Sequence, residues 1–328
     1  MTARRKLLLA LGAVGALAAL PVLAQQEKRA RRIGYFSGGN LQSSAAWLAA
    51  FREGMTSLRW VEKRDYVIDA RYGNGVVKAF DGLAAELVAT QPDLLLASGD
   101  TVARLLAQKT KTIPIVFAIA QGPVEIGLAA SLQRPGGNAT GLTTLAQELG
   151  AKKLQLLKEA FPRVAHVVVL FDPGVRGSAL QAKEAEGAAA SLGVRVTAIE
   201  LVQLADIEAA FKRGAELGVH AYVVTDSALV AAQLPAIADR IMRAKVPAIC
   251  AFNHFADIGG LMSYGASYTD NFRRSAAYVD KILKGAKPGE LPIEQPTVFE
   301  LAVNLKTAKA MGLRFPQSFL VRANRLIE

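Results

Sequence analysis

The sequence predicts an α/β protein made of two doubly wound, parallel-sheet lobes joined by a hinge. Strand-like apolar runs alternate with helix-like segments along most of the chain, and such alternation with short connections is typical of parallel sheets covered by helices. Three apolar strands of the first half have counterparts in the second half, at 33–37, 92–100 and 113–117 and at 167–172, 221–226 and 246–250. The offset of roughly 125–135 residues is the size of one domain.

The spacing of apolar residues supports each element of this fold. Helical periodicity predicts helices at 45–58, 80–90, 178–192, 207–217 and 268–284. Gly193 and Gly218 follow two of these helices, as expected for residues that end a helix in the left-handed conformation. Residues 66–72 alternate like a half-buried strand. The first strand of each half is apolar throughout, which indicates burial on both faces of its sheet.

Turn signals suggest where the lobes meet. Residues 134–138 (Arg-Pro-Gly-Gly-Asn) separate the two halves, and residues 285–289 contain a second cluster of Gly and Pro. We therefore expect the first lobe at 28–142 plus 254–288 and the second at 143–253 plus 289–328. Two similar lobes imply a cleft between them, and clefts of this kind are common sites for small ligands.

The N-terminus has the pattern of a secretory signal peptide. Arg4, Arg5 and Lys6 precede an uncharged apolar run at 7–20, and Val22-Leu23-Ala24 resembles a cleavage site. A membrane anchor is the alternative, but a spanning helix needs about 20 apolar residues. We expect cleavage after Ala24, export to the periplasm and no transmembrane span in the mature chain.

Charge and cysteine content narrow the possible partners. The net charge is +11, which falls to about +8 once the three cations of the signal peptide are removed. The remaining cations are spread along the chain, apart from a group at 28–32, so we expect a solvated basic surface and no nucleic-acid partner. Cys250 is the single cysteine. It cannot form an internal disulfide, and its place in an apolar strand predicts a small core residue.

Candidate ligand-binding residues follow the strands, because ligands of open parallel sheets bind beyond the carboxyl ends of the strands. Backbone N–H groups at helix starts, with Ser and Thr hydroxyls, suit a carboxylate. Aspartates suit an ammonium group, and aromatic rings, including Phe171 and Phe252, suit an apolar side chain. The candidates are Phe36, Ser37, Asn40, Ser98, Gly99, Asp100, Thr101, Ala120, Gln121, Asp172, Thr225, Asp226, Ser227, Asn253 and Tyr264.

Each kind of candidate has a structural alternative. Asp100 and Asp226 occupy positions suited to capping a helix, and Asp172 precedes Pro173-Gly174 as a turn residue would. The aromatic candidates could instead fill the core. These alternatives remain open at the level of sequence.

Motifs of catalysis and cofactor binding are missing from the sequence. His166, His220 and His254 lack metal-ligand spacing; the first two are expected at the surface and the third in a cleft loop. The chain has no G-x-S-x-G elbow, P-loop or dinucleotide fingerprint. We therefore expect no catalytic residues, no metal and no cofactor, and a protein that is not an enzyme.

Three segments carry a resemblance to a known family. Residues 113–117 (Ile-Pro-Ile-Val-Phe), 131–141 and 303–308 (Val-Asn-Leu-Lys-Thr-Ala) resemble the substrate-binding proteins of bacterial ABC transporters. The resemblance covers about 32–313 and points to a group with the type I periplasmic-binding fold that is related to tryptophan and tyrosine uptake. It implies two lobes joined by three crossovers, which close over a small solute by hinge bending and present it to an ABC permease in the inner membrane.

The resulting hypothesis is a monomeric receptor that binds an aromatic or apolar amino acid, or a related carboxylate, for an ABC importer. One alternative is a binding protein that signals to a membrane receptor or kinase, which the sequence does not separate from transport. An exported enzyme is disfavoured because the catalytic motifs are missing. A transcription regulator is disfavoured because a signal peptide stands where a DNA-reading helix-turn-helix is expected.

Overall fold

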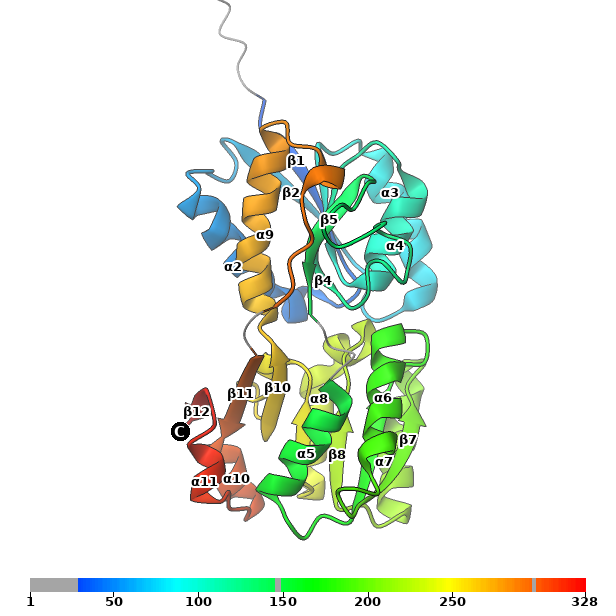
Figure 1. Ribbon diagram of the computed structural model, residues 1–328, viewed down its shortest axis with the longest axis vertical. Coiled ribbons are helices and arrows are strands. Elements are labelled where there is room, and N and C mark those ends of the chain that lie inside the picture. The colour runs from blue at the N-terminus through cyan, green and yellow to red at the C-terminus, as the bar shows by residue number, and fades with distance from the viewer. Residues whose placement is uncertain (1–28, 145–148, 297–298) are drawn as a thin grey trace, which may run out of the picture. The chain divides into compact units, whose positions relative to one another are not determined.

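The computed structural model describes residues 29–144, 149–296 and 299–328 (Figure 1). The expected signal peptide therefore lies outside the described residues. The first sheet has five parallel strands in the order β2-β1-β3-β4-β5. They are β1 (Arg31–Ser37), β2 (Tyr66–Tyr72), β3 (Leu94–Ser98), β4 (Ile115–Ala120) and β5 (Ala139–Thr143). We call this sheet, with the helices packed on it, the first lobe.

Helices cover both faces of the first sheet. Successive side chains of a strand point to opposite faces, so Tyr35 and Leu96 pack with α2 (Leu41–Ser57) and α9 (Tyr268–Leu283), whereas Phe36 and Leu95 pack with α3 (Phe80–Ala89) and α4 (Asp100–Lys109). A short 3-10 helix, η1 (Val77–Ala79), precedes α3. Burial on both faces explains the apolar runs of β1, β3 and β4, whereas β2, at the edge of the sheet, is mostly half-buried.

The second sheet has seven strands in the order β12-β11-β10-β9-β8-β6-β7, and we call it, with its helices, the second lobe. Its parallel core contains β6 (His166–Phe171), β7 (Arg195–Glu200), β8 (Ala221–Val224), β9 (Ala248–Cys250) and β10 (Met262–Ala266). The helices α5 (Gly150–Ala160) and α6 (Arg176–Ala188) pack on one face, and α7 (Leu204–Glu216) and α8 (Ala228–Ala244) pack on the other.

The edge of the second sheet is completed by the end of the chain. β11 (Phe299–Asn304) is antiparallel to β10, and β12 (Arg325–Ile327) is parallel to β11. The other short elements of this part are η3 (Asn253–Phe255), α10 (Leu305–Met311) and α11 (Gln317–Leu320). A further 3-10 helix, η4 (Pro288–Glu290), lies in the first lobe, where Gly136 N donates to Gly289 O at 3.1 Å. The α/β fold with two mainly parallel sheets confirms the fold class that the sequence predicts.

The crossovers between the lobes differ in place from the expected boundaries. The chain passes from β5 to α5, from β10 to α9, and back again before β11. Residues 254–266, expected in the first lobe, belong to the second, because β10 pairs with β9 and β11. Residues 289–296, expected in the second lobe, continue along the first, where the Glu294 N–H donates to Gly141 O at 3.0 Å. The crossover from β10 to α9 lies at Ser267, the N-cap residue of α9, and not at a cluster of Gly and Pro.

α9 docks on the first lobe although it lies between strands of the second sheet in sequence. Its Asn271 amide donates to Ala118 O of β4 and to Thr143 O of β5, both at 3.1 Å. It also packs closely on α2 at Gly54, where an added Cβ would lie 2.3 Å from Arg273 O. Only glycine allows the two helices to approach this closely.

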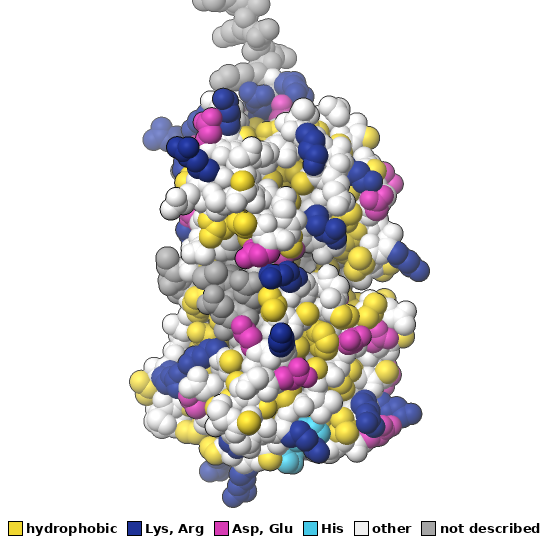
Figure 2. Space-filling model, turned by 45° about the vertical axis from the view of Figure 1, so that its right-hand side comes forward, with side chains coloured by type: hydrophobic (Ala, Val, Ile, Leu, Met, Phe, Trp, Pro, Cys, Tyr) yellow, Lys and Arg dark blue, Asp and Glu magenta, His cyan; other side chains and the backbone are white. Residues whose placement is uncertain are grey.

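The surface and the interior agree with the composition. Lys and Arg side chains lie apart on the face shown in Figure 2 and are interspersed with Asp and Glu. Within the described residues, none of the helices is both long and apolar enough to cross a bilayer. Cys250 is buried and free in β9, and burial raises the pKa of its thiol to about 12. The prediction of a core cysteine is thus confirmed.

Candidate functional site

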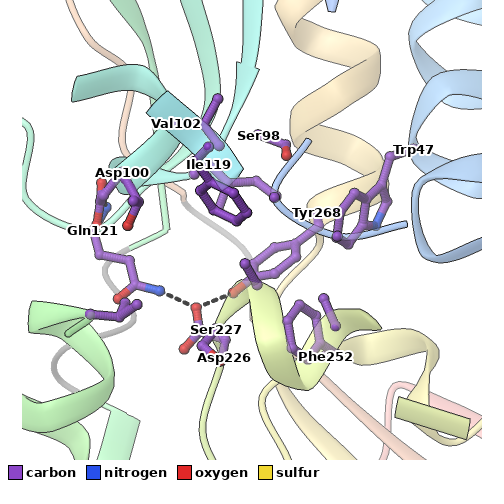
Figure 3. Close-up of a pocket in the computed structure, with 18 residues that line it drawn as sticks. Trp47, Ser98, Asp100, Val102, Ile119, Gln121, Asp226, Ser227, Phe252 and Tyr268 are labelled. Carbon is purple, nitrogen blue, oxygen red and sulfur yellow. Dashed lines mark hydrogen bonds between the residues drawn. The ribbon is translucent and has the colours of Figure 1, made fainter. Parts of the chain in front are cut away.

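A pocket between the lobes is the candidate functional site (Figure 3). The void between its lining atoms, including the open mouth, is about 560 Å³. The lining residues are Gly38, Gly39, Trp47, Phe80, Ser98, Gly99, Asp100, Thr101, Val102, Ile119, Gln121, Val175, Asp226, Ser227, Ala228, Ala231, Phe252 and Tyr268.

The sheet topology determines where this pocket lies. The first lobe contributes residues at the carboxyl ends of β1, β3 and β4, and the second contributes residues at the carboxyl ends of β8 and β9. Parallel strands bring these ends to one edge of each sheet, and the two edges face each other. The turn from β3 into α4 depends on Gly99, whose φ of 109° favours glycine. The pocket therefore lies beyond the carboxyl ends of the strands, where the sequence analysis expects a ligand to bind.

Asp226 is held by a buried hydrogen-bond network. Its Oδ1 accepts from Gln181 Nε2 at 2.7 Å, and its Oδ2 accepts from Tyr268 Oη at 2.7 Å and from Gln121 Nε2. Behind it, the ammonium of Lys153 donates to Gln181 Oε1. Burial lowers the pKa of Lys153, and the charge of Asp226 opposes this effect. Asp226 is thus a well-satisfied carboxylate with a buried cation close by.

Asp100 is half-buried and has fewer hydrogen-bond partners. Among the described residues it accepts one hydrogen bond, from the backbone N–H of Gln121 to Oδ1 at 2.9 Å. Burial raises the pKa of Asp100 to about 7; the Gln121 N–H opposes the rise, and the charges of Asp226 and Glu125 add to it. The two pocket carboxylates come from opposite lobes, so closure of the lobes brings like charges together. A cationic group between them would relieve this repulsion.

Neither aspartate caps a helix, so this alternative is wrong for both. Gly99 is the N-cap of α4, and Asp100 is the first helical residue. Ser227 is the N-cap of α8 and accepts from Val230 N at 3.2 Å. α4 begins without a side-chain cap and its first residues line the pocket, so its first N–H groups are donors that a side-chain cap does not occupy.

Aromatic rings form one wall of the pocket. Trp47 of α2 stacks on Phe272 at 5.6 Å between ring centroids and on Phe252 at 6.3 Å, and Tyr268 meets Trp47 edge-on at 6.0 Å. Trp47, Phe80 and Tyr268 were not predicted, because they come from helices and the prediction considered the residues that follow strands. For Trp47 the sequence does contain one signal, its position on the apolar face of the helix predicted at 45–58.

The structure brings part of the predicted set together. Ser98, Gly99, Asp100, Thr101, Gln121, Asp226 and Ser227 line the pocket, as does Phe252. Their contact with a ligand stays a prediction. The other candidates lie outside the lining: Phe36, Ser37, Asn40, Ala120, Asp172, Thr225, Asn253 and Tyr264.

Strand alternation and local hydrogen bonds explain the candidates of the first lobe that lie outside. Phe36 points into the core and packs edge-on against Phe80 at 5.7 Å. Ser37 is fully buried, and its hydroxyl bonds to Ser44 Oγ at 2.8 Å. Ala120 is part of the same core as Phe36.

In the second lobe the outlying candidates have local partners of their own. Asp172 Oδ1 accepts from Gly174 N at 2.9 Å, which confirms the turn alternative. Thr225 Oγ1 donates to Leu170 O at 3.0 Å. Tyr264 stacks on a neighbouring strand residue at 6.2 Å. The side-chain amide of Asn253 donates to a backbone carbonyl at 3.4 Å.

The histidines do not form a site with one another. His220 is exposed, as expected, but His166 is buried at the start of β6, where Nε2 bonds to Thr197 Oγ1 at 2.9 Å. His254 packs edge-on against Trp47 at 6.1 Å. In the part of the chain that the structure describes, there is no cluster of three or more metal-ligating side chains.

Comparison with known proteins identifies the family. Residues 62–327 match the family described as ABC transporter substrate binding protein. The chain belongs to this family. As a substrate-binding protein it has a small-molecule ligand, and its family membership implies an ABC permease as partner. The family comprises solute-binding proteins.

Individual relatives agree with this assignment. A tyrosine-binding protein of Clostridioides difficile (strain R20291) is 24% identical over 247 residues, which cover 75% of this chain and 71% of that protein. A conserved domain protein from Vibrio cholerae has a TM-score of 0.81 at 25% identity, over 91% of this chain and 100% of the other. A Streptococcus pneumoniae domain in complex with L-Trp has the same fold, with a TM-score of 0.81 at 23% identity over 91% and 100% of the two chains.

Proposed function

We propose that this substrate-binding protein is the periplasmic, monomeric receptor of an ABC importer for an aromatic or other apolar L-amino acid. The observation that carries the proposal is the composition of the pocket. A half-buried carboxylate, Asp100, lines the same pocket as aromatic rings that include Trp47 and Phe252, and helix starts from both lobes meet there. These are the groups that an ammonium, an apolar side chain and a carboxylate need.

The ammonium of the ligand would pair with Asp100 rather than with Asp226. Asp226 already accepts hydrogen bonds from Gln121, Gln181 and Tyr268. Among the described residues, Asp100 accepts one hydrogen bond, from the backbone N–H of Gln121, and burial raises its pKa. A ligand cation would keep its carboxylate ionised, and charge-assisted hydrogen bonds in a closed site are strong.

The carboxylate of the ligand would bind at the helix starts. α4 begins without a side-chain cap, and Ser98 and Thr101 also line the pocket. Backbone N–H groups and the helix dipole favour an anion there. The aromatic wall would take the side chain of the ligand.

The pocket lies between the two lobes, and its void of about 560 Å³ includes the open mouth. Entry of a ligand would involve hinge opening of the lobes and closure over the ligand. The curated relative named tyrosine-binding protein supports an aromatic amino acid as the first ligand to test.

Titration calorimetry and thermal shift test the proposal on protein that was unfolded and refolded to remove any copurified ligand. L-Tyrosine and L-tryptophan should stabilise it by roughly 2.7 kcal/mol at 100 times the Kd. Tyramine lacks the carboxylate, and 3-(4-hydroxyphenyl)propionate lacks the ammonium; both should bind far more weakly. Equal binding of all four, or binding of a sugar alone, would contradict the proposal.

Export is tested separately. Mass spectrometry of the protein from a periplasmic fraction should give an N-terminus at Gln25, because we propose cleavage after Ala24. An intact N-terminus would contradict this part of the proposal. Analytical ultracentrifugation with and without ligand should show a monomer.

A further inference from the structure

Asn40 makes two kinds of hydrogen bond, one in each lobe. It stands between β1 and α2, and its Oδ1 accepts from Ser43 N at 2.8 Å to cap α2. Its Nδ2 donates to Ala232 O at 2.9 Å, in α8 of the second lobe. One side chain thus starts a helix of the first lobe and ties that lobe to the second.

The contact around this bond is made of small residues. An added Cβ on Gly38 would lie 2.7 Å from Ala228 Cβ, and an added Cβ on Gly75 would lie 3.1 Å from Leu229 Cα. Gly75 has a φ of 75°, which favours glycine in any case. The loops after β1 and β2 therefore lie directly on the first turns of α8. We call this contact the α8 seam.

The bond from Asn40 does not depend on a ligand. Asn40 is absent from the lining of the ligand pocket, and both of its partners are protein groups. Hinge opening that separates the first lobe from α8 would expose the Asn40 amide and Ala232 O to water, so the bond would contribute only to the closed state. A contact present in one of two states shifts the equilibrium toward that state.

We propose that Asn40 is a positioning residue for ligand binding, which favours lobe closure through its bond to Ala232 O and does not touch the ligand. The inference rests on the proposed function insofar as closure over the ligand is the binding step. Apparent affinity falls with the fraction of protein in the binding-competent state. Loss of one hydrogen bond should therefore weaken binding roughly two- to tenfold.

The test separates the two bonds of Asn40. In Asn40→Ser the hydroxyl still caps α2, since Ser is as good an N-cap as Asn, but it is too short to replace the bond to Ala232 O. The matched control is Asn304→Ser. Asn304 caps α10 by accepting from Thr307 N at 2.8 Å and donates to Ala256 O at 2.7 Å, within the second lobe alone.

Two measurements test the role of Asn40. Spin labels at Glu86→Cys in α3 and Lys212→Cys in α7, both exposed positions, report the distance between the lobes, while Cys250 is fully buried and does not label. Calorimetry with L-tyrosine reports the Kd. We expect Asn40→Ser to lower the closed fraction of the ligand-free protein and to raise the Kd roughly two- to tenfold, and Asn304→Ser to change neither.

The outcomes are distinct. Unchanged lobe distances in Asn40→Ser, equal changes in both variants, or a ligand-free wild type without any closed fraction would each overturn the role of Asn40. Failure of wild-type protein to bind L-tyrosine would count against the proposed function instead. In that case the ligand-free distances alone still decide on Asn40.

Discussion

Asp100→Asn should raise stability and lower affinity, a combination that a purely structural residue does not give. The substitution removes the charge and nearly preserves the shape, and the amide oxygen can still accept from Gln121 N. In the folded protein the pKa of Asp100 is raised from 3.8 to about 7. At 1.36 kcal/mol per pKa unit this is about 4 kcal/mol of destabilisation of the ionised form.

The sign of the pH effect follows from this pKa. Between pH 3.8 and about 7 the closed, folded protein binds a proton at Asp100 that the unfolded chain does not. The destabilisation is therefore fully present above pH 7 and is lost as the pH falls toward 4. Wild-type stability should rise on acidification from pH 8 to pH 5, and the gain from Asp100→Asn should be greatest at pH 8. The ~4 kcal/mol is an upper bound, because hinge opening hydrates the carboxylate without unfolding.

Affinity should change in the opposite direction. A ligand ammonium pairs with the ionised carboxylate, so Asp100→Asn should lose roughly 2–5 kcal/mol of binding free energy for L-tyrosine. Protons compete with the ligand below pH 7, so the wild-type Kd should rise up to about tenfold per pH unit there. The variant should show no such dependence on pH.

Urea unfolding and calorimetry between pH 5 and pH 8 measure both effects. Asp226→Asn is the matched control, because Asp226 accepts hydrogen bonds from three side chains and its replacement should destabilise the protein at every pH. The charge of Asp100 has neither role if Asp100→Asn destabilises the ligand-free protein at pH 8 and binds L-tyrosine as tightly as wild type does; either result alone removes the corresponding role.

Further predictions concern the packing around the pocket. Lys153→Met should destabilise by about 1–3 kcal/mol, because it leaves the buried Gln181 Oε1 without its donor; a urea midpoint equal to that of wild type would contradict this. Tyr268→Phe removes the 2.7 Å hydrogen bond to Asp226 and should cost about 1.5–3 kcal/mol in the same assay. Gly54→Ala places a Cβ 2.3 Å from Arg273 O and should cost roughly 1–3 kcal/mol; an unchanged thermal midpoint would show that α2 and α9 can separate at no cost.

The sequence predicts those elements best whose surroundings are uniform. β1, β3, β4 and β6 are covered on both faces, so each has an apolar run that identifies it in the sequence as a buried strand. α8 is harder to predict because Pro235 lies inside it and interrupts the helical pattern. The path of residues 254–296 is harder still, since pairing of β10 with β9 and β11 is a long-range choice that turn residues do not report.

The sequence could predict only those site residues that directly follow a strand. Ser98 to Thr101 and Asp226 follow strands directly and line the pocket. Trp47 and Tyr268 come from helices that lie more than 200 positions apart in the chain, and their contact at 6.0 Å depends on how α9 docks. Asn40 follows β1 closely but takes part in the α8 seam, which depends on the relative position of the lobes.

The docking of α9 on α2 has a consequence for the order in which the chain can fold during synthesis. The indole of Trp60 donates to Asp280 Oδ1 at 2.8 Å, between residues 220 positions apart. Until α9 has been made, the side of α2 that packs on α9 at Gly54 has no cover. A truncated chain that ends before Tyr268 should therefore expose this face and aggregate, and neither lobe can be produced by a single cut. Unfolding of the intact chain should accordingly be one cooperative transition, not the sum of two.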